Sequence, residues 1–88
     1  MILKVFIQPG CYRCPAAKNL GNKVKKHLVV EFWDVTNADG LAEASFYNVY
    51  STPSLILVSD DGKELAGWRA KVSSTEENFW EPWLRHAN

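Results

Sequence analysis

Two cysteines separated by two residues constrain the fold of this chain more than any other sequence feature. They are Cys11 and Cys14, and they lie between two segments of different periodicity. Leu3–Gln8 is rich in β-branched and aromatic residues and is followed by a Pro-Gly pair, which predicts a strand that ends in a sharp turn. From Cys14 to Leu28 apolar residues recur at helical spacing, opposite a lysine-rich side. The cysteine pair is therefore predicted at a strand-to-helix turn.

Pro15 limits where this helix can begin. Proline is tolerated in the first turn of a helix, where its missing N–H has no intrahelical partner, so we expect the helix to begin near Cys11. Gly21, in the middle of the helix, indicates a close packing contact.

Five further elements are predicted downstream. A nearly continuous apolar run suits a strand that is covered on both faces, and an Asp-Asp-Gly turn favours an antiparallel hairpin. The expected elements are a strand over Leu28–Val35, a helix over Asp39–Val49, strands over Leu55–Val58 and Lys63–Arg69 around a turn at Asp60–Gly62, and a last helix opened by capping boxes in Ser73–Glu77. The order β-α-β-α-β-β-α predicts an α/β fold with a four-stranded mixed sheet flanked by helices, in which the first two strands are parallel.

The two later helices each have a predicted buried face. The helix over Asp39–Val49 takes Asp39 as its N-cap, and its inward residues are Leu41, Ala42, Phe46 and Val49. A proline inside the last helix predicts a kink or an early end there. The last helix has Phe79, Trp80, Trp83 and Leu84 as its buried residues and Pro82 as the proline, and Trp33 also follows a core-facing pattern.

Composition excludes several classes of protein. Ten Lys plus Arg balance ten Asp plus Glu, so no global positive field draws the chain to nucleic acid or to an anionic membrane. The longest apolar runs fall far short of the roughly 20 residues that span a bilayer. The segment Met1–Ile7 has no signal-peptide pattern, so we do not expect export. For 88 residues that are 47% hydrophobic we expect one domain over residues 1–88, present as a cytoplasmic monomer.

The spacing of the cysteines predicts thiol–disulfide exchange. At a helix N-terminus, unpaired N–H groups and the positive end of the helix dipole stabilise the thiolate of Cys11, and Arg13 adds positive charge. Cys14, one turn further along, is within disulfide distance and more shielded. Cys11 is thus the candidate nucleophile and Cys14 the candidate resolving thiol. Two other interpretations are a pair of small core residues, and half of a zinc site completed by a second chain or by distant ligands.

Together with two further motifs, the cysteines make the chain resemble the thioredoxin–glutaredoxin superfamily over nearly its whole length. The motifs are Cys11-Tyr12-Arg13-Cys14-Pro15 after the first strand, Thr52-Pro53 before the third and Asp60-Asp61-Gly62 before the fourth. The resemblance implies a thioredoxin-like fold, a redox-active dithiol and electron transport to a disulfide-containing client protein. It implies a reductase or a small thiol as the source of electrons, and no cofactor.

The same resemblance implies roles for individual residues outside the cysteines. It predicts a cis peptide bond before Pro53 and a backbone at Thr52 that pairs with the client. The client surface is then expected around the cysteine motif and the hairpin, at Tyr12, Arg13, Tyr50 and Trp68.

Three segments differ from the patterns of that superfamily. Thioredoxins usually have Trp before the first cysteine, Gly-Pro between the two cysteines and a buried Asp on the first strand, where this chain has Gly10, Tyr12-Arg13 and Val5. Glutaredoxins that use glutathione have a Gly-Gly pair and an Asp after the fourth strand, where this chain has Ala66-Gly67-Trp68-Arg69. Arg69 and Lys71 could hold a carboxylate of glutathione, but no acidic residue in Ala66–Val72 is present to bind its amine. We therefore expect glutathione to be a poor electron donor and a dithiol, or an enzyme resembling thioredoxin reductase, to be a better one.

Three alternative functions use the same fold or the same thiols. A carrier of a soft metal ion such as Cu(I) or Zn(II) would bind it through both thiolates, although such carriers commonly have a β-α-β-β-α-β order. A glutathione-dependent glutaredoxin is the second alternative. A non-catalytic interaction domain is the third, and measurable disulfide reductase activity would exclude it.

Overall fold

The structure is a computed structural model, and it describes residues 1–70. The elements in these residues are β1 (Ile2–Ile7), α1 (Cys14–Val24), β2 (Val29–Asp34), α2 (Ala38–Phe46), β3 (Ser54–Val58) and β4 (Glu64–Arg69). Their order agrees with the predicted order as far as the fourth strand. The predicted last helix, with Phe79, Trp80, Pro82, Trp83 and Leu84, lies outside the described residues. Within residues 1–70, no helix is long and apolar enough to cross a membrane.

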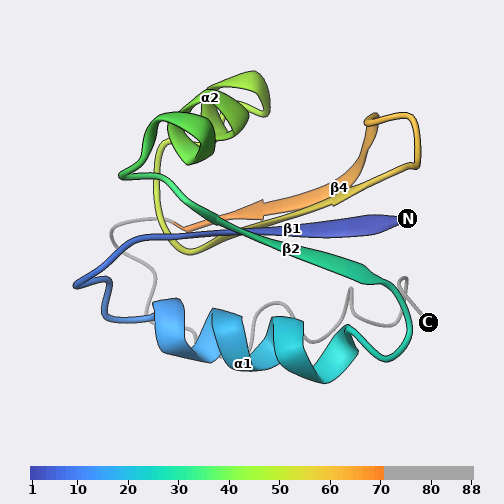
Figure 1. Ribbon diagram of the computed structural model, residues 1–88, viewed down its shortest axis with the longest axis horizontal. Coiled ribbons are helices and arrows are strands. Elements are labelled where there is room, and N and C mark those ends of the chain that lie inside the picture. The colour runs from blue at the N-terminus through green and yellow to red at the C-terminus, as the bar shows by residue number, and fades with distance from the viewer. Residues whose placement is uncertain (71–88) are drawn as a thin grey trace.

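The four strands form one mixed sheet in the order β2-β1-β3-β4. β1 runs parallel to β2 and antiparallel to β3, and β3 and β4 form the predicted antiparallel hairpin. Gly62 closes the hairpin turn with a φ of 88°, a conformation that favours glycine. Figure 1 shows α1 on one face of the sheet and α2 on the other. The predicted fold class, a four-stranded mixed sheet flanked by helices, is confirmed.

The side chains of the sheet divide into two cores, one on each face. Successive side chains of a strand point to opposite faces, so β1 contributes to both cores. We call the side of the sheet that contacts α1 the α1 face, and the opposite side the α2 face. The core of the α1 face consists of Leu3, Val5, Ala17, Leu20, Val24, Leu55 and Leu57, and the core of the α2 face consists of Phe6, Ala44, Tyr47, Val49, Ile56 and Val58.

β3 and β2 differ in burial because they occupy different places in the sheet. All five residues of β3 are buried, since this strand pairs on both sides. The sequence predicts that the strand after α1 is covered on both faces, and this prediction is wrong. Val29 and Phe32 in β2 are 59% and 40% exposed. β2 lies at the edge of the sheet, where α1 and α2 cover it only in part.

α1 begins later and ends earlier than the sequence predicts. It begins at Cys14, not near Cys11, because the residues ahead of it form turns in which the Cys11 amide donates to the carbonyl of Gln8 and the Cys14 amide to that of Cys11. Pro15 lies in the first turn, as expected. The helix ends at Val24 and not at Leu28, since the chain after Val24 makes turns before it enters β2.

α2 has a different N-cap and a different buried face from those predicted. Its N-cap is Asn37, whose Oδ1 accepts a hydrogen bond from the amide of Gly40 at 2.7 Å, so the prediction of Asp39 is wrong. Its buried residues are Gly40 and Ala44, while Leu41 and Phe46 are 58% and 72% exposed. The predicted inward positions Leu41, Ala42 and Phe46 are therefore wrong, and Val49 is buried but lies beyond the end of the helix.

Gly40 explains this orientation of α2. A Cβ atom at that position would overlap the backbone carbonyl of Asp34 at the end of β2. The helix can therefore approach the sheet closely only at a glycine. Close approach at Gly40 places this face of α2 inward and leaves Leu41 at the surface.

A buried cation on the α2 face is the largest feature of the fold that the sequence does not predict. Lys4 is 7% exposed, and its Nζ donates to carboxylate oxygens of Glu31 at 2.8 Å and Glu43 at 2.5 Å. The same Nζ lies 5.2 Å from the ring centroid of Trp33 and 5.7 Å from that of Tyr47. Because Glu31 is the register partner of Lys4 in β2 and Glu43 is in α2, the ammonium connects two strands to the helix.

Candidate active site

The turn between β1 and α1 carries the two cysteines, which form a disulfide. Their Cα atoms are 5.3 Å apart, within the range that a disulfide requires. Cys14 is the first residue of α1 and is 3% exposed, whereas Cys11 lies in the turn and is partly exposed. The two cysteines thus differ in exposure in the direction that the sequence predicts.

The electrostatic surroundings of this turn are positive. The expectation that Cys11 itself begins the helix is wrong, but its bond to Cys14 places its sulfur beside the first turn of α1. That turn contains no acidic residue to oppose the helix dipole. Arg13 is the N-cap residue, and its Nη1 is buried without a hydrogen-bond partner among residues 1–70. Such a field stabilises a thiolate over a thiol.

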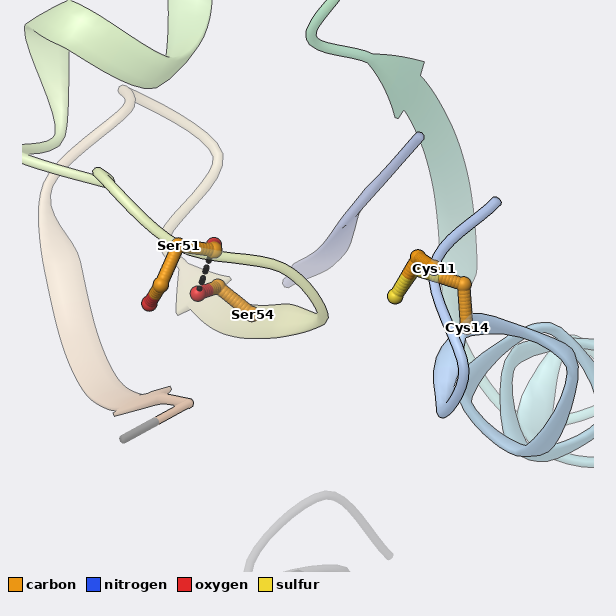
Figure 2. The surroundings of a disulfide bond; sticks show 4 residues. All are labelled: Cys11, Cys14, Ser51 and Ser54. Atoms are coloured by element: carbon orange, nitrogen blue, oxygen red, sulfur yellow. Dashed lines mark hydrogen bonds between the residues drawn. A yellow bond between two sulfur atoms is a disulfide. The ribbon is translucent and has the colours of Figure 1, made fainter. Parts of the chain in front are cut away.

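A loop that precedes β3 lies beside the cysteine turn. The peptide bond between Thr52 and Pro53 is cis, as predicted. Pro53 and Ser54 are buried, and the Ser54 hydroxyl donates to the carbonyl of Ser51 at 2.8 Å. Figure 2 shows Ser51 on this loop and Ser54 at the start of β3, across from Cys11 and Cys14.

An open cavity of about 280 Å³ joins the loop to the turn. Strand pairing explains this, because Phe6 near the end of β1 lies opposite Ser54 at the start of β3. The segment that leaves β1 and the segment that enters β3 therefore meet at one end of the sheet. The lining residues are Gln8, Cys11, Tyr12, Arg13, Ser51, Thr52 and Ala70. Four residues predicted for the site, Cys11, Tyr12, Arg13 and Thr52, are thus brought together.

A second cavity, of about 290 Å³, is lined by a carboxylate that the sequence pattern does not indicate. Asp34, at the end of β2, lines it together with Cys11, Cys14 and Lys18. Hydrogen bonds from the hydroxyl and the amide of Thr36, at 2.6 and 2.8 Å, hold the pKa of the Asp34 carboxyl below its ordinary value. The parallel register could have revealed this residue, because it pairs Asp34 with Ile7 at the end of β1.

A third cavity, of about 240 Å³, adjoins the Thr52 loop on the α2 face. Its lining is largely apolar and includes Val35, Leu41, Ala44 and Val49. Tyr50 lines it too and is 82% exposed. Tyr12, on the cysteine turn, is 87% exposed. Two accessible aromatic side chains therefore flank the disulfide end of the molecule.

Neither Trp68, predicted to contact the client, nor Arg69, considered for a glutathione carboxylate, lines these cavities. Trp68 pairs with Leu55 in the sheet and is packed, partly buried, against the core of the α1 face. It does not line any of the three cavities described above. Arg69 is ion-paired with Glu64 at 2.8 Å, so its guanidinium is already engaged. Lys71, the other residue considered for a glutathione carboxylate, lies outside the described residues.

No cluster of metal ligands occurs in residues 1–70 that contains three or more His, Cys, Asp or Glu side chains. Any metal held by this part of the chain would have Cys11 and Cys14 as its available thiolates, after reduction of their disulfide.

Comparison with known proteins gives one family and many similar structures. Residues 1–77 match the family model described as a thioredoxin domain. Thioredoxin 1 from Thermosipho africanus is 21% identical, with a TM-score of 0.70 over 100% of this chain and 99% of that one. The reduced thioredoxin pre-protein of Schistosoma mansoni is 15% identical, with a TM-score of 0.74 over 99% of this chain and 78% of that one.

A thioredoxin from Thermus thermophilus is 20% identical, with a TM-score of 0.68 over 97% of this chain and 71% of that one. At these identities the solved structures establish a shared fold. A search of curated protein sequences found no matching relative.

Proposed function

Because this chain belongs to the thioredoxin domain family, we propose that it is a thiol–disulfide oxidoreductase that reduces disulfides in client proteins. One observation carries the proposal: a Cys11–Cys14 disulfide of unequal exposure opens on a cavity shared with Thr52. A purely structural disulfide has no need of an accessible cysteine beside a cavity. The fold, the family and this geometry support the same chemistry.

The reaction begins with the reduced protein, in which Cys11 is the nucleophile. Its thiolate attacks one sulfur of the client disulfide, so that a mixed disulfide forms, the client S–S bond breaks, and the departing client thiolate takes up a proton. Cys14 then loses its proton and attacks the sulfur of Cys11. The mixed disulfide breaks, the second client thiol leaves, and the Cys11–Cys14 disulfide remains. Two electrons have passed to the client.

Positive charge near the cysteines supports the assignment of Cys11 as nucleophile. The side chain of Arg13 and the N-terminal end of α1 both favour the thiolate form, and Cys11 is the more accessible of the pair. Cys14 is shielded from a bulky client but lies within bonding distance of Cys11, which suits a resolving thiol. Lys18 and Asp34 add one charge of each sign to the cavity that both cysteines line.

The client is held by the surface around the first cavity. An extended client segment would pair with the backbone of Thr52 beside Pro53, in the manner that the family resemblance implies. Tyr12 and Arg13 lie on the other side of that cavity and would contact the same segment. Trp68 would contact the client only outside the three cavities, so its place in this set depends on client size.

We expect a dithiol or a reductase, and not glutathione, to return the chain to the dithiol state. A glutathione site needs groups for two carboxylates and one amine, and the candidate Arg69 is occupied by Glu64. An unpaired ammonium of the tripeptide would lose about 1–3 kcal/mol of affinity, or one to two decades. No cofactor enters this reaction.

Variants of the two cysteines test the proposed function. The Cys14→Ser protein should accumulate a mixed disulfide with an oxidised polypeptide such as insulin, because its second step is blocked. Cys11→Ser is the matched control and should accumulate none. Alkylation of the reduced chain at neutral pH should modify Cys11 first, as mass spectrometry would show. Trapping through Cys14 in the Cys11→Ser protein would reverse the two roles.

A comparison of electron donors tests the second part of the proposal. Reduction of insulin is followed once with a dithiol and once with glutathione plus its reductase, at equal reducing capacity. We expect turnover with the dithiol and little with glutathione. Efficient turnover at millimolar glutathione would make the chain a glutathione-dependent redoxin instead.

A further inference from the structure

The segment between α2 and β3 is part of the candidate site and contains neither a helix nor a strand. It covers residues 47–53, leaving α2 at Tyr47 and entering β3 at Ser54. Its last residues bring Thr52 to the cavity that Cys11 lines. Since neither a helix nor a strand fixes its path, its position depends on contacts from neighbouring elements.

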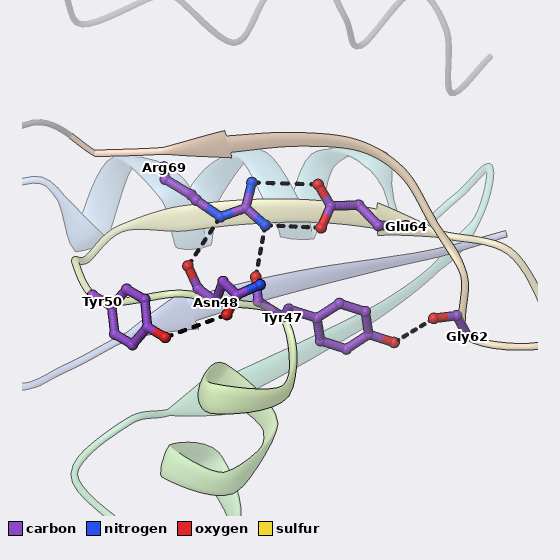
Figure 3. A network of polar contacts seen from close by, with 6 residues as sticks. All are labelled: Tyr47, Asn48, Tyr50, Gly62, Glu64 and Arg69. Atoms are coloured by element: carbon purple, nitrogen blue, oxygen red, sulfur yellow. Dashed lines mark hydrogen bonds and ion pairs between the residues drawn. The ribbon is translucent and has the colours of Figure 1, made fainter.

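Arg69, near the end of β4, makes the first of these contacts. Its Nη2 donates to the carbonyl of Tyr47 at 2.7 Å, and its Nε donates to the carbonyl of Asn48 at 3.3 Å. Nη2 and Nη1 of the same group donate to the two carboxylate oxygens of Glu64 at 2.8 and 3.3 Å. Figure 3 shows the guanidinium between Glu64 and the two carbonyls. Only a planar group with several donors can make all four contacts at once.

The two carbonyls belong to the residues at which the chain leaves α2. Tyr47 is the C-cap of the helix, where carbonyl groups lack intrahelical partners and a cation is favourable. Asn48 has a φ of 57°, a left-handed conformation that reverses the chain. Arg69 therefore holds the start of the segment at the point where its direction is set.

A serine makes the second contact, close to the end of the segment. The hydroxyl of Ser51 donates to the carbonyl of Ala70 at 2.6 Å, and the carbonyl of Ser51 accepts from the hydroxyl of Ser54 at 2.8 Å. Ala70 directly follows β4, so both contacts attach the segment to the same end of this strand. Thr52 directly follows Ser51, so the contacts of Ser51 also restrict the position of Thr52.

We infer that Arg69 and Ser51 are positioning residues that set Thr52 at the distance from Cys11 that an extended client requires. The inference rests on the proposed function. Neither side chain exchanges electrons. Ser51 lines the cavity beside Thr52, whereas Arg69 does not line it, so Arg69 gives the test that is free of direct contact with the client. Their effect is confined to clients that contact the Thr52 backbone, and a disulfide too small to reach that backbone does not depend on them.

The test compares KM for a large and a small disulfide in matched variants. Arg69→Lys keeps the positive charge beside Glu64, but its single ammonium nitrogen has three donors and cannot reproduce the four contacts that Arg69 makes from three separate nitrogens. Ser51→Ala removes the contact with Ala70. We expect each to raise KM for reduction of insulin about three- to tenfold, the loss expected from one or two hydrogen bonds, with kcat nearly unchanged. The rate of reduction of hydroxyethyl disulfide should stay within about twofold of the wild type.

Two control variants separate positioning from charge and from general stability. Glu64→Gln removes the ion pair but leaves the donors of Arg69 free to bind Tyr47 and Asn48, and KM for insulin should change less than about twofold. Ser59→Ala removes another serine hydroxyl, in the hairpin turn at the far end of β3, and should have no effect on KM.

Three outcomes would overturn a proposal, and they can be told apart. Unchanged KM for insulin in folded Arg69→Lys and Ser51→Ala proteins would overturn the positioning role alone. An equal loss with insulin and with hydroxyethyl disulfide would also overturn it, because the effect would then act on the thiols. A wild-type chain that reduces neither disulfide would overturn the proposed function itself.

Discussion

On the α1 face, the helix that carries Cys14 contacts the sheet through apolar side chains, and within residues 1–70 the core there includes no buried charged side chain. On the α2 face, the helix that leads to Thr52 contacts the sheet through a smaller apolar core, a buried ammonium and two polar connections to β4 and its hairpin turn. Apolar contacts do not depend on direction, whereas hydrogen bonds and ion pairs do. The comparison shows that apolar packing positions the half of the site that carries Cys14, whereas directional polar contacts help to position the half that carries Thr52.

The largest effect is expected from a substitution at the closest contact between α2 and the sheet. In Gly40→Ala the new Cβ meets the backbone carbonyl of Asp34, which cannot move aside as a side chain can. We expect the free energy of unfolding to fall by about 3 kcal/mol or more, as chemical denaturation would measure. A fall of less than about 1 kcal/mol would show that α2 is not seated at Gly40.

The second largest effect is expected when the buried cation is removed. Lys4→Met keeps an unbranched side chain of similar length but leaves Glu31 and Glu43 without their shared partner. Because both carboxylates are partly exposed, we expect a loss of about 2 kcal/mol, less than for a fully buried pair. Lys18→Met, at an exposed position of α1, is the control and should change the free energy of unfolding little. If the two variants were equally stable, the buried ammonium would not contribute to the stability of the α2 face.

A smaller effect is expected from pH, and it should act on the α2 face. Burial alone would lower the pKa of Lys4, but hydrogen bonds and charges of Glu31 and Glu43 outweigh it and raise the pKa above its ordinary 10.5. The hydrogen bond from Lys4 lowers the pKa of Glu31 below its ordinary 4.5, against the opposing effect of burial. The stability from Lys4 is therefore complete below pH 10.5 and is lost as pH rises through its folded pKa.

The contribution of Glu31 has the opposite sign with pH. It is present above pH 4.5 and is lost as pH falls through the lowered pKa. Urea titrations from neutral pH down to about pH 3 and up to about pH 11 should show both losses in the wild type and smaller ones in Lys4→Met. Identical pH profiles for the two proteins would contradict the assignment of these titrations to the ammonium and its partner.

The smallest effect concerns the corresponding glycine on the α1 face. A Cβ at Gly21 would come within 2.9 Å of the ring of Phe32, a side chain that is 40% exposed and free to shift. Replacement by alanine also recovers about 1 kcal/mol of helix propensity, so the two contributions nearly cancel. Unfolding of Gly21→Ala should differ from wild type by less than about 1 kcal/mol. A loss as large as that of Gly40→Ala would erase the difference between the faces.

Patterns along the chain predicted what depends on neighbouring residues. Periodicity and turn residues identified the four strands, the hairpin and both described helices, and the cysteine spacing located the candidate site. The predictions were wrong where contacts with residues elsewhere in the fold determine the local structure. The start of α1 depends on turn hydrogen bonds around Cys11, and the inward face of α2 depends on contact between Gly40 and Asp34.

The polar residues of the α2 face were missed for a related reason. Lys4 is a single charged residue in an otherwise apolar strand, and its neighbours on the same face of β1, Ile2 and Phe6, are apolar. Only the folded structure shows that carboxylates from β2 and α2 neutralise it.

The sequence indicates Arg69 only as a group that could hold a carboxylate of glutathione. In the structure it binds the carbonyls of Tyr47 and Asn48, which lie in a segment distant in sequence. A sequence pattern gives no signal for contacts of this kind.

The antiparallel register of β1 and β3 also identifies a site, far from the cysteines, at which the protein could be immobilised on a surface. It puts Phe6 and Ser54 at the end that carries the cavities, and Ile2 and Val58 at the other, next to the turn at Asp60 and Asp61. Both aspartates are exposed, and β3 separates them from the disulfide by about 13 Å of strand. A peptide epitope inserted between these aspartates would tether the chain to a bead or sensor surface while its cysteines stay open to solution.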